Sequence, residues 1–382
     1  MQDKQDVIIV GGGPVGLVLA LALQQQGVPF TVLEARAKGA SHQDTRALAL
    51  SYGSRLILEK LGVWDDLEAK ATAINTIHIS QRGGLGRTRL SAAEHNLPAL
   101  GYVVAYGALT QALDKKLDVS QVRYGAEATE IRPGELFAQV TFNKTETLQS
   151  ALIVVADGGR SLGEIAGIER ETKEYGHDAL VTKVRAELPH NNIAYERFTP
   201  QGPMALLPNG ERDFSLVWTG LQVNIHAVSG LPDFEFLQQL HEAFGDRVGK
   251  FLSVEKRLSF PLKLSTLKPA TASHLVVIGN AAQTMHPVAG QGFNVGMRDA
   301  WTLADLIVSA SPGKLGSAEM LNRYSQQRKR DTRGGILFTD FLVNVFSNDV
   351  IGMSALRGAG LGILELLKPA KSFLVGKMSF GK

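Results

Sequence analysis

The chain has 382 residues, too many for one compact hydrophobic core, so its length predicts two domains. An apolar fraction of 44% and a charged fraction of 20% are typical of a globular protein, and a net charge of +3 gives no reason to expect nucleic acid as a partner. The absence of cysteine excludes disulfides, thiolate metal sites and a cysteine nucleophile, and the spacing of the nine histidines predicts no metal site.

A βαβ unit opens the chain. A short β-branched strand at 7–10 is followed by glycines at GxGxxG spacing, a helix over 15–26 and a second strand at 30–33. The stretch from 7 to 33 carries no charge, but glycines, Pro14 and three glutamines interrupt it. It therefore predicts strand, turn and helix rather than a membrane span or a signal peptide.

The glycines of this unit predict a nucleotide site. Gly11 permits the tight turn, Gly13 lets a diphosphate approach the backbone, and Gly16 lets the helix pack on the strand. The amides at the start of the helix then face the phosphate charge. Glu34 ends the second strand 23 residues after Gly11, where its carboxylate can accept hydrogen bonds from ribose hydroxyls.

Further helices and strands follow along the chain. Apolar periodicity predicts helices at 54–61 and 109–117, and strands at 74–90, 122–142 and 152–156.

Polar residues on the connections between these elements are candidates for ligand contacts. Arg46 can donate to a phosphate or form a surface ion pair, and the sequence leaves both open. Asp157 and Gly158 follow the strand at 152–156, at the end where open α/β sheets bind ligands. A plain Asp-Gly turn is the alternative, and on this motif alone it is the better interpretation.

The pattern changes between 175 and 264. Short strand-like runs separated by Pro, Gly and Asn predict an antiparallel sheet, on which we expect the substrate to bind. These runs are 180–184, 194–198, 204–207, 214–218 and 223–227. A helix is predicted at 237–244.

The α/β pattern returns with a strand at 275–278, a loop and a long helix that ends near Val308. Backbone amides at 290–292 lie at the positive end of that helix, which suits a bound group that becomes anionic. The nucleotide fold therefore brackets the sheet region, and the domains are predicted to be discontinuous. The predicted boundaries are 1–72, 101–171 and 272–330 for the nucleotide domain, 73–100 and 172–271 for the sheet domain, and 331–382 for a C-terminal helical region.

The end of the chain is basic and amphipathic. From Gln326 onward it carries nine Lys and Arg against four acidic residues, and a basic cluster at 328–330 precedes apolar helical faces at 338–346 and 363–367. These faces either rest on an anionic membrane surface or pack on the protein or on a second subunit. The sequence leaves both interpretations open, and it predicts no oligomeric state.

Three motifs taken together resemble a known family. GGGPVG with its terminal Glu34, DGGRS at 157–161 and GNAAQTMHPVAGQGFNVGMRD at 279–299 resemble the single-component flavin aromatic hydroxylases of the para-hydroxybenzoate hydroxylase type. The third motif and ERFTPQGPMALLP at 196–208 are more closely similar to the ubiquinone-biosynthesis hydroxylases of the UbiH/VisC type. The resemblance implies an α/β fold: a Rossmann-like FAD-binding domain with an inserted antiparallel-sheet substrate domain and a C-terminal helical region.

The resemblance also implies roles for individual residues. Gly11, Gly13 and Gly16 would hold the FAD diphosphate, and Glu34 the adenosine ribose. The other FAD-binding positions would be Pro14, Arg46, Gln111, Asp157, Gly158, Asn280, Gly292 and Asn294. The isoalloxazine would lie beside Pro287, Gly290, Gln291 and Gly292, with His286 as an acid or base or, more simply, a hydrogen-bonding residue that holds the loop. Asn280 stands where many relatives have Asp, and it can still bond a ribityl hydroxyl without charge assistance.

The resemblance implies a monooxygenase. In such enzymes NADPH or NADH reduces FAD, O₂ adds to give a C4a-hydroperoxide, and a hydroxyl group passes to an electron-rich ring. The substrate would be a polyprenylated phenol of ubiquinone biosynthesis. The resemblance implies a location in the cytoplasm or at the inner face of the membrane, and partners among the other proteins of that pathway. Three alternatives stay open: a hydroxylase of a small soluble phenolic acid, a flavin reductase of isoprenoid double bonds, and a non-catalytic FAD-bearing subunit of a complex.

Overall fold

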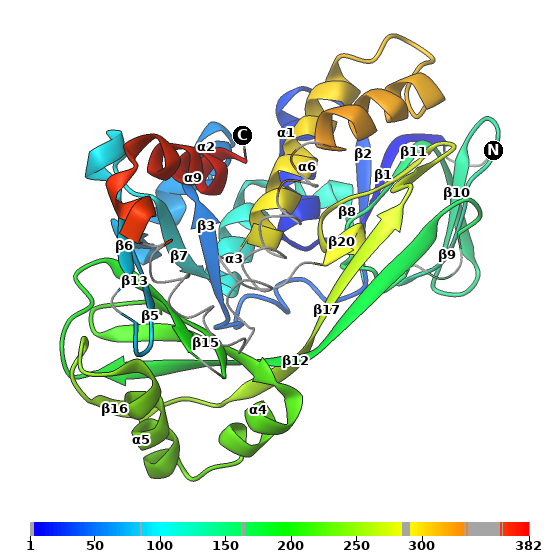
Figure 1. Ribbon diagram of the computed structural model, residues 1–382. Helices are drawn as coiled ribbons and strands as arrows, with labels where there is room; N and C mark the ends of the chain where they lie inside the picture. The colour runs from blue at the N-terminus through cyan, green and yellow to red at the C-terminus, as the bar shows by residue number, and fades with distance from the viewer. Residues whose placement is uncertain are drawn as a thin grey trace.

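The computed structural model describes residues 4–84, 86–161, 163, 165–199, 201–284, 291–329, 331, 334, 360 and 362–381. Two large β-sheets lie beside each other, and the long strands β12 (Glu169–Ala186) and β17 (Leu258–Lys268) run from one to the other (Figure 1). The helices α1 (Pro14–Gln25) and α6 (Gln291–Val308) cover the first sheet.

The first sheet confirms the predicted βαβ unit. Its strand order is β18-β19-β11-β1-β2-β8, and β1 pairs in parallel with both β2 and β11. The strands are β1 (Lys4–Val10), β2 (Phe30–Glu34), β8 (Val122–Tyr124), β11 (Glu146–Val155), β18 (Thr271–Ala272) and β19 (Leu275–Val277), with β9 (Ala128–Arg132) and β10 (Ala138–Phe142) added in antiparallel fashion at β11. The first strand of the chain and strands at 271–277 therefore belong to one sheet.

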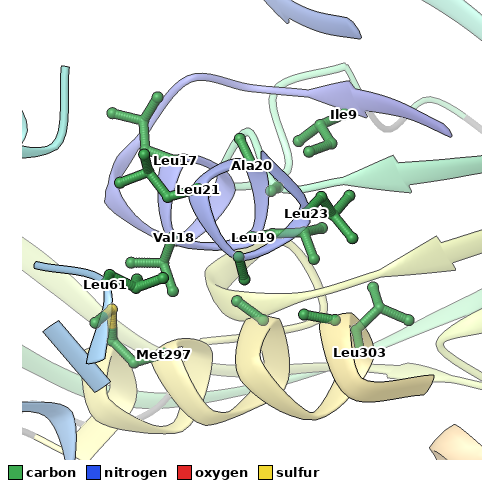
Figure 2. Packing of buried hydrophobic residues seen from close by; sticks show 14 of the residues in the cluster. Ile9, Leu17, Val18, Leu19, Ala20, Leu21, Leu23, Leu61, Met297 and Leu303 are labelled. Carbon is green, nitrogen blue, oxygen red and sulfur yellow. The ribbon is translucent and has the colours of Figure 1, made fainter. Parts of the chain in front are cut away.

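Apolar side chains of α1 and α6 fill the space over one face of this sheet. In Figure 2, Leu19 and Val18 of α1 face Met297 of α6, and Ile9 of β1 closes the layer behind them. Residues 17–23 are buried throughout, which explains the unbroken apolar run. A helix that is apolar all round is a core helix, and this one is covered by protein on every side.

A small sheet and several short helices complete this part of the molecule. Strand β7 (Gly101–Ala105) pairs with β3 (Ala47–Ser51) and β4 (Thr72–Ile74), and the helices α2 (Tyr52–Lys60) and α3 (Tyr106–Lys116) follow β3 and β7 directly. The single-turn helices are η1 (Trp64–Asp66), η2 (Glu68–Lys70), η3 (Ala93–His95), η4 (Val119–Gln121) and η5 (Gly279–Ala281).

The second sheet has the order β20-β17-β12-β15-β14-β13-β5-β6, with β16 paired to β12. Its remaining strands are β5 (Thr76–Gln81), β6 (Arg87–Ser91), β13 (Ile193–Thr199), β14 (Gly202–Pro208), β15 (Asp213–Leu221), β16 (Phe251–Val254) and β20 (Gln283–Thr284). It is antiparallel as predicted except at one pair, because β13 runs parallel to β5.

One predicted strand is wrong. Residues 223–227 belong to the helix α4 (Gln222–Ser229), which buries Ile225 and Val228 against Trp218 of the sheet. Val223, Ile225 and Ala227 alternate as in a strand, and a run of five residues is too short to separate that pattern from the helical spacing of Ile225 and Val228. The helix predicted at 237–244 is the C-terminal part of α5 (Asp233–Phe244).

The C-terminal region is helical where the structure describes it. Residues 318–329 are helical, and α9 (Lys368–Phe380) lies beside α2 and β3 (Figure 1). Among the helices that the structure describes, none is both long and apolar enough to cross a bilayer. The apolar face predicted at 338–346 lies outside the described residues.

Candidate functional site

Close backbone contacts shape the turn between β1 and α1. Gly11 has a φ of +108°, and a Cβ there would lie 2.6 Å from the Cα of Asp157. A Cβ on Gly16 would lie 2.1 Å from the carbonyl oxygen of Gly11. At Gly13 the nearest atom to an added Cβ is the hydroxyl oxygen of Tyr106, 3.6 Å away. The first and last glycines are therefore required by the fold, whereas the middle one borders open space.

The start of α1 beside this open space suits an anion. Gly13 is the N-cap of α1, no side chain caps the helix, and Pro14 stands at its first position, where the missing amide costs nothing. The first-turn amides therefore face the space without a partner from a capping side chain, and the helix dipole favours an anion there.

Glu34 lies next to this turn. Its Oε2 atom accepts a hydrogen bond of 2.7 Å from the backbone amide of Gly12, and its Oε1 atom accepts one of 2.7 Å from Nε of Arg36. Burial by itself would raise the pKa of Glu34, but the bonds from Arg36 and Gly12 hold it below its usual value. The carboxylate is therefore ionised and fixed at the end of β2, beside a narrow hollow that Thr110 and Asp114 also line.

Arg46 is fixed beside the same turn. Its guanidinium bonds both carboxylate oxygens of Asp44, at 2.6 to 3.0 Å, and lies 5.1 Å from the centre of the Tyr106 ring. Because Tyr106 borders the open space at Gly13, Arg46 adds positive charge near the proposed diphosphate position. Both interpretations from the sequence, ion pair and phosphate contact, are compatible with this geometry.

Gln111 lies apart from these residues. Its side chain lines a separate hollow with His42 and Lys70, and Nζ of Lys70 is 3.5 Å from its Oε1 atom. On the same helix, Thr110 lines the hollow at Glu34, and Asp114 lines both hollows. The Gln111 side chain therefore lies on the wall of this second hollow, and its contact with FAD stays a prediction.

The Asp157 carboxylate holds its own turn. It accepts hydrogen bonds from the amide of Gly159 at 2.8 Å and from the amide and hydroxyl of Ser161 at 2.6 and 2.5 Å. Gly158 has a φ of +76°, which suits this turn. The contacts match the Asp-Gly turn that the sequence analysis offered as the alternative, and the turn lies against Gly11.

Val15 joins the first motif to the third. A Cβ on Gly279 would lie 3.3 Å from one methyl of Val15, and a Cβ on Gly296 would lie 3.0 Å from the other. The turn after β19 and the helix α6 therefore close on the start of α1. This packing places Asn280 at the cavity wall, with its side-chain oxygen 3.9 Å from the Cβ position of Gly292.

The start of α6 carries the other predicted flavin neighbours. Gln291 and Gly292 form its first turn and line the cavity described below. Asn294 also lines it, but its amide binds the small sheet: it accepts from the Ser51 amide at 2.7 Å and donates to the Ala49 carbonyl at 2.9 Å. His286, Pro287 and Gly290 lie outside the described residues.

A buried ion-pair network supports this region. The Asp299 carboxylate accepts from Nε of Arg328 at 2.6 Å and from the Gly279 amide at 3.1 Å. Arg328 also pairs with Asp331, which pairs with Arg298. Burial acts against the charge of Arg328, but the two carboxylates raise its pKa. Asp299 stands in the third motif, yet nothing in the sequence identifies its partner. The network also excludes Arg328 from the lipid-facing role that the basic cluster suggested.

An apolar cavity of about 330 Å³ lies between the second sheet on one side and the small sheet, α6 and α9 on the other. Its lining includes Gln291 and Gly292 on one side and Glu196 of β13 on the other. The remaining described lining residues are mostly aliphatic: Ala47, Leu48, Ala49, Leu50, Ser51, Ile74, Ile77, Leu90, Leu100, Gly101, Val181, Ala194, Ala205, Leu207, Val217, Asn280, Thr284, Phe293, Asn294, Val375, Met378 and Ser379. No cluster of His, Asp and Glu suited to a metal ion occurs among the residues that the structure describes.

The helix α9 forms part of the cavity wall. Val375, Met378 and Ser379 line it, and the buried hydroxyl of Ser379 has no hydrogen-bond partner among the residues that the structure describes. Val375 packs with Leu90 of β6. The sequence predicted helical faces in this region, but no pattern in it indicated a place in the cavity.

Comparisons with known proteins agree with this geometry. Residues 4–334 match the family model described as an FAD binding domain. The chain is 35% identical to the ubiquinone hydroxylase UbiL of Rhodospirillum rubrum, over 96% of this chain and 87% of that protein. It is 31% identical to the 3-demethoxyubiquinol 3-hydroxylase of Escherichia coli, over 94% of both chains. The solved p-nitrophenol 4-monooxygenase PnpA of Pseudomonas putida has the same fold, with a TM-score of 0.80 at 17% identity and 99% of both chains covered.

Proposed function

The chain belongs to the FAD binding domain family, and from that premise we propose that it is an FAD-dependent monooxygenase that hydroxylates the ring of a polyprenylated phenol in ubiquinone biosynthesis. The observation that carries the substrate class is the cavity, whose wall is aliphatic and which adjoins Asn280 and the start of α6. An apolar ring and an isoprenoid unit gain most from leaving water for such a wall.

We infer that residues of the first and third motifs hold FAD. The open space at Gly13 takes the diphosphate, Glu34 takes the adenosine ribose, and Asn280 and Gly292 take the ribityl and ring end. When bound, FAD supplies the transfer of electrons from NADPH or NADH and the activation of O₂.

The protein contributes positioning, electrostatics and a dry cavity. The amides at the start of α6 favour negative charge at the ring end of the flavin, and losing one such donor costs about 3 kcal/mol of barrier in comparable sites. Pro287 and Gly290 stay predicted members of this loop, and His286 a predicted hydrogen-bonding residue. The aliphatic wall excludes water, which would otherwise divert reducing equivalents to hydrogen peroxide.

A small soluble phenolic acid fits this cavity less well. Such a substrate carries a carboxylate, which needs Arg, Lys or a comparable donor in the pocket. Among the described lining residues no Arg, Lys or His occurs, and the ionisable residue is Glu196, which would repel a carboxylate. This observation favours a neutral phenol.

The deciding experiment follows the fate of oxygen. Purified protein with FAD, NADPH or NADH, a short-chain prenylphenol and isotopically heavy O₂ should give a product that contains one heavy oxygen atom. A reductase of isoprenoid double bonds would add two hydrogens and no oxygen, and a non-catalytic subunit would leave the phenol unchanged. Each alternative therefore has its own mass shift, and either of them would overturn the proposal.

We also propose that the C-terminal region touches the membrane in which such a substrate resides. Ile363, Leu366, Leu367 and Phe373 are large apolar side chains that are between 50% and 81% exposed, and α9 beside them lines the cavity. Exposed apolar side chains of this kind can enter the headgroup region. Flotation with anionic liposomes should fall when Leu366 and Phe373 are both changed to Ser, and unchanged flotation would remove this part of the proposal.

A further inference from the structure

Five arginines lie together at the end of the second sheet where β6 forms its edge. This arginine patch consists of Arg82, Arg87, Arg89, Arg197 and Arg247. Strand β6 pairs with β5 so that Arg89 stands opposite His78 and Arg87 opposite Ser80. On the other side of β5, Arg197 also stands beside Ser80, and its Nη1 atom donates to the Ser80 hydroxyl at 3.4 Å. Because cross-strand partners share a face, three arginines of the patch project from one face of the sheet.

The chain that follows α5 adds a fourth arginine to this face. Nε of Arg197 donates to the carbonyl of Ala243 in α5 at 3.2 Å, and a Cβ on Gly245 would lie 3.9 Å from Nη2 of Arg197. Arg247 comes two residues later, and its charge acts on Arg197 together with that of Arg82. The patch therefore combines β6, the two ends of the β5–β13 pair and the segment after α5.

The positive charge of the arginine patch has no matching acid. Four of its side chains are exposed, and none of the five forms an ion pair with a carboxylate among the residues that the structure describes. Asp246, which precedes Arg247, pairs with His241 at 3.0 Å instead. Burial and the neighbouring positive charges lower the pKa of Arg197. Like charges this close repel each other, so an anion from outside would relieve the repulsion.

A buried imidazole lies beneath the arginines. His78 is 5% exposed, and its ring centre is 5.8 Å from that of Tyr195, its neighbour on the same face. In the described ranges of the chain, Nδ1 of His78 has no hydrogen-bond partner. The floor of the patch therefore supplies no negative charge, and its unpaired polar atom is a second sign that a group from outside completes this surface.

The arginine patch adjoins exposed apolar residues of the C-terminal region. Glu365 accepts a hydrogen bond from the backbone amide of Arg89 at 2.9 Å and one from the Thr88 hydroxyl at 2.8 Å, so this region is attached to β6 (Figure 1). Leu366 and Leu367, the next residues, are 81% and 50% exposed. Positive charge beside exposed apolar side chains is the composition of a protein face that rests on an anionic bilayer. An acidic protein surface would match the charge but not these apolar side chains.

We propose that the arginine patch binds the phosphate groups of anionic phospholipids and so fixes the β6 edge and the C-terminal region on the bilayer together. This inference rests on the membrane contact proposed above and adds an electrostatic contact on a different part of the chain. A guanidinium group presents a planar fork of donors that matches a phosphate, and several on one face match an array of headgroups. Since α9 lines the cavity and follows the attached segment, this orientation brings the cavity wall close to the lipid in which a prenylphenol dissolves.

The test measures vesicle binding by the full-length protein with FAD bound. Flotation is compared between vesicles of phosphatidylcholine alone and vesicles of equal parts phosphatidylcholine and phosphatidylglycerol. The wild type should prefer the anionic vesicles, and added sodium chloride should weaken the preference. The double variant Arg87→Gln/Arg89→Gln should bind the anionic vesicles about tenfold less well and the neutral vesicles equally well.

A second arm separates a lipid headgroup from a free phosphate. Sodium phosphate and sodium chloride are compared as competitors at equal ionic strength, and both should displace the wild type from anionic vesicles to the same extent. Displacement by phosphate well beyond that by chloride would assign the patch to a small free anion and would overturn the inference.

The matched control removes two positive charges at the far end of the molecule. Arg132→Gln/Lys144→Gln changes exposed residues at the β9–β10 hairpin, far from β6 in Figure 1, and it should bind anionic vesicles as the wild type does. FAD content and melting temperature show whether each variant is folded. Turnover of a soluble short-chain prenylphenol should be the same in both double variants, so a failure of the proposed hydroxylation is recorded separately.

Three results would overturn the inference. The wild type could bind anionic and neutral vesicles equally, or the two double variants could lose the same affinity, which would indicate net charge rather than the patch. If the wild type binds neither vesicle, the inference falls together with the membrane contact of the C-terminal region, and an acidic protein becomes the better partner for the patch. If Leu366→Ser/Phe373→Ser lowers flotation while Arg87→Gln/Arg89→Gln does not, only the inference falls.

Discussion

The Oε2 atom of Glu34 accepts a hydrogen bond from the backbone amide of Gly12 at 2.7 Å, so the end of β2 and the turn after β1 are joined directly. A Cβ on Gly12 would lie 2.9 Å from the same oxygen. The carboxylate that we assign to the ribose is thus already oriented by the glycine turn that we assign to the diphosphate. Preorganisation of this kind reduces the entropy lost on binding.

Changing Glu34 to Gln should weaken FAD binding without unfolding the protein. The amide oxygen can still accept from Gly12, but the ion pair with Arg36 and the charge-assisted bonds to ribose are lost. We expect the dissociation constant of FAD to rise about tenfold, measured by flavin fluorescence on titration of the apoprotein. The melting temperature of the apoprotein should change little, and a large fall in it would mean that Glu34 acts mainly in folding.

Two alanine variants of the glycine turn should separate folding from cofactor binding. Gly16→Ala places a Cβ 2.1 Å from the Gly11 carbonyl oxygen, so the protein should be strongly destabilised. Gly13→Ala meets no atom nearer than 3.6 Å, so the apoprotein should remain folded. Its methyl group would project into the space that we assign to the diphosphate, and FAD affinity should fall about tenfold or more. Apoprotein melting curves and FAD titrations of both variants test this contrast, and normal FAD binding by Gly13→Ala would contradict the assignment.

Much of the nucleotide domain could be predicted because its signals are local. Strand, glycine turn and helix follow one another within the first 34 residues, and periodicity alone identifies each of them. The return of the α/β pattern at 275–308 placed the third motif in the same domain as the first, but no pattern in the sequence indicated how the two motifs meet. The structure explains it through Val15, which fits between Gly279 and Gly296.

The remaining features depend on strand register and on long-range partners. The inward direction of Glu196 follows from its pairing with Ile79 and Ala205, which no local pattern reveals. The orientation of Gln111 depends on how α3 is rotated against the sheet, so a motif position could not determine which hollow it faces. The bond between Asp299 and Arg328 spans 29 residues, and the sequence showed only a basic cluster.

Removing the Asp299 charge should destabilise the protein markedly. In Asp299→Asn the buried Arg328 loses its nearest counter-charge, which lies 2.6 Å away. The Asn side chain has one acceptor oxygen in place of two, so it can accept from Arg328 or from the Gly279 amide but not from each with its own oxygen. Breaking one partner of a buried pair costs about 3 kcal/mol in free energy of unfolding. Urea unfolding of the apoprotein measures this change in the free energy of unfolding. The exposed pair of Lys268 and Glu171 is the matched control, and Glu171→Gln should cost less than about 1 kcal/mol. Equal effects of the two changes would contradict the role of burial.

Enlarging a side chain of α9 should restrict the substrate. Val375 is 3% exposed and lines the cavity, so Val375→Phe would fill part of its volume. We expect a lower affinity for a geranylphenol than for an unprenylated phenol, whereas the wild type should show the reverse order. Binding to the oxidised holoprotein gives both constants. A parallel loss for both ligands would indicate general disruption of the cavity instead.

His78 should make the protein sensitive to mild acid. It is 5% exposed, and burial together with the nearby Arg247, Arg89 and Arg87 lowers its pKa to about 4. Within the described part of the chain, its Nδ1 atom has no hydrogen-bond partner. In the unfolded chain its pKa returns to about 6.5. As the pH falls from about 6.5 to 4, the unfolded state therefore binds a proton that the folded state does not, and the free energy of unfolding decreases.

The replacement of His78 by Gln tests whether the free energy of unfolding decreases with falling pH because of His78. The variant cannot take up the proton, so between about pH 7 and pH 4.5 the wild type should lose about 2 kcal/mol more than His78→Gln. Urea unfolding at a series of pH values measures the difference. Arg247→Gln removes one of the facing charges, so it should raise the pKa of His78 and reduce the acid loss in part. Identical acid profiles for the wild type and His78→Gln would show that His78 protonates in the folded protein as it does in the unfolded chain.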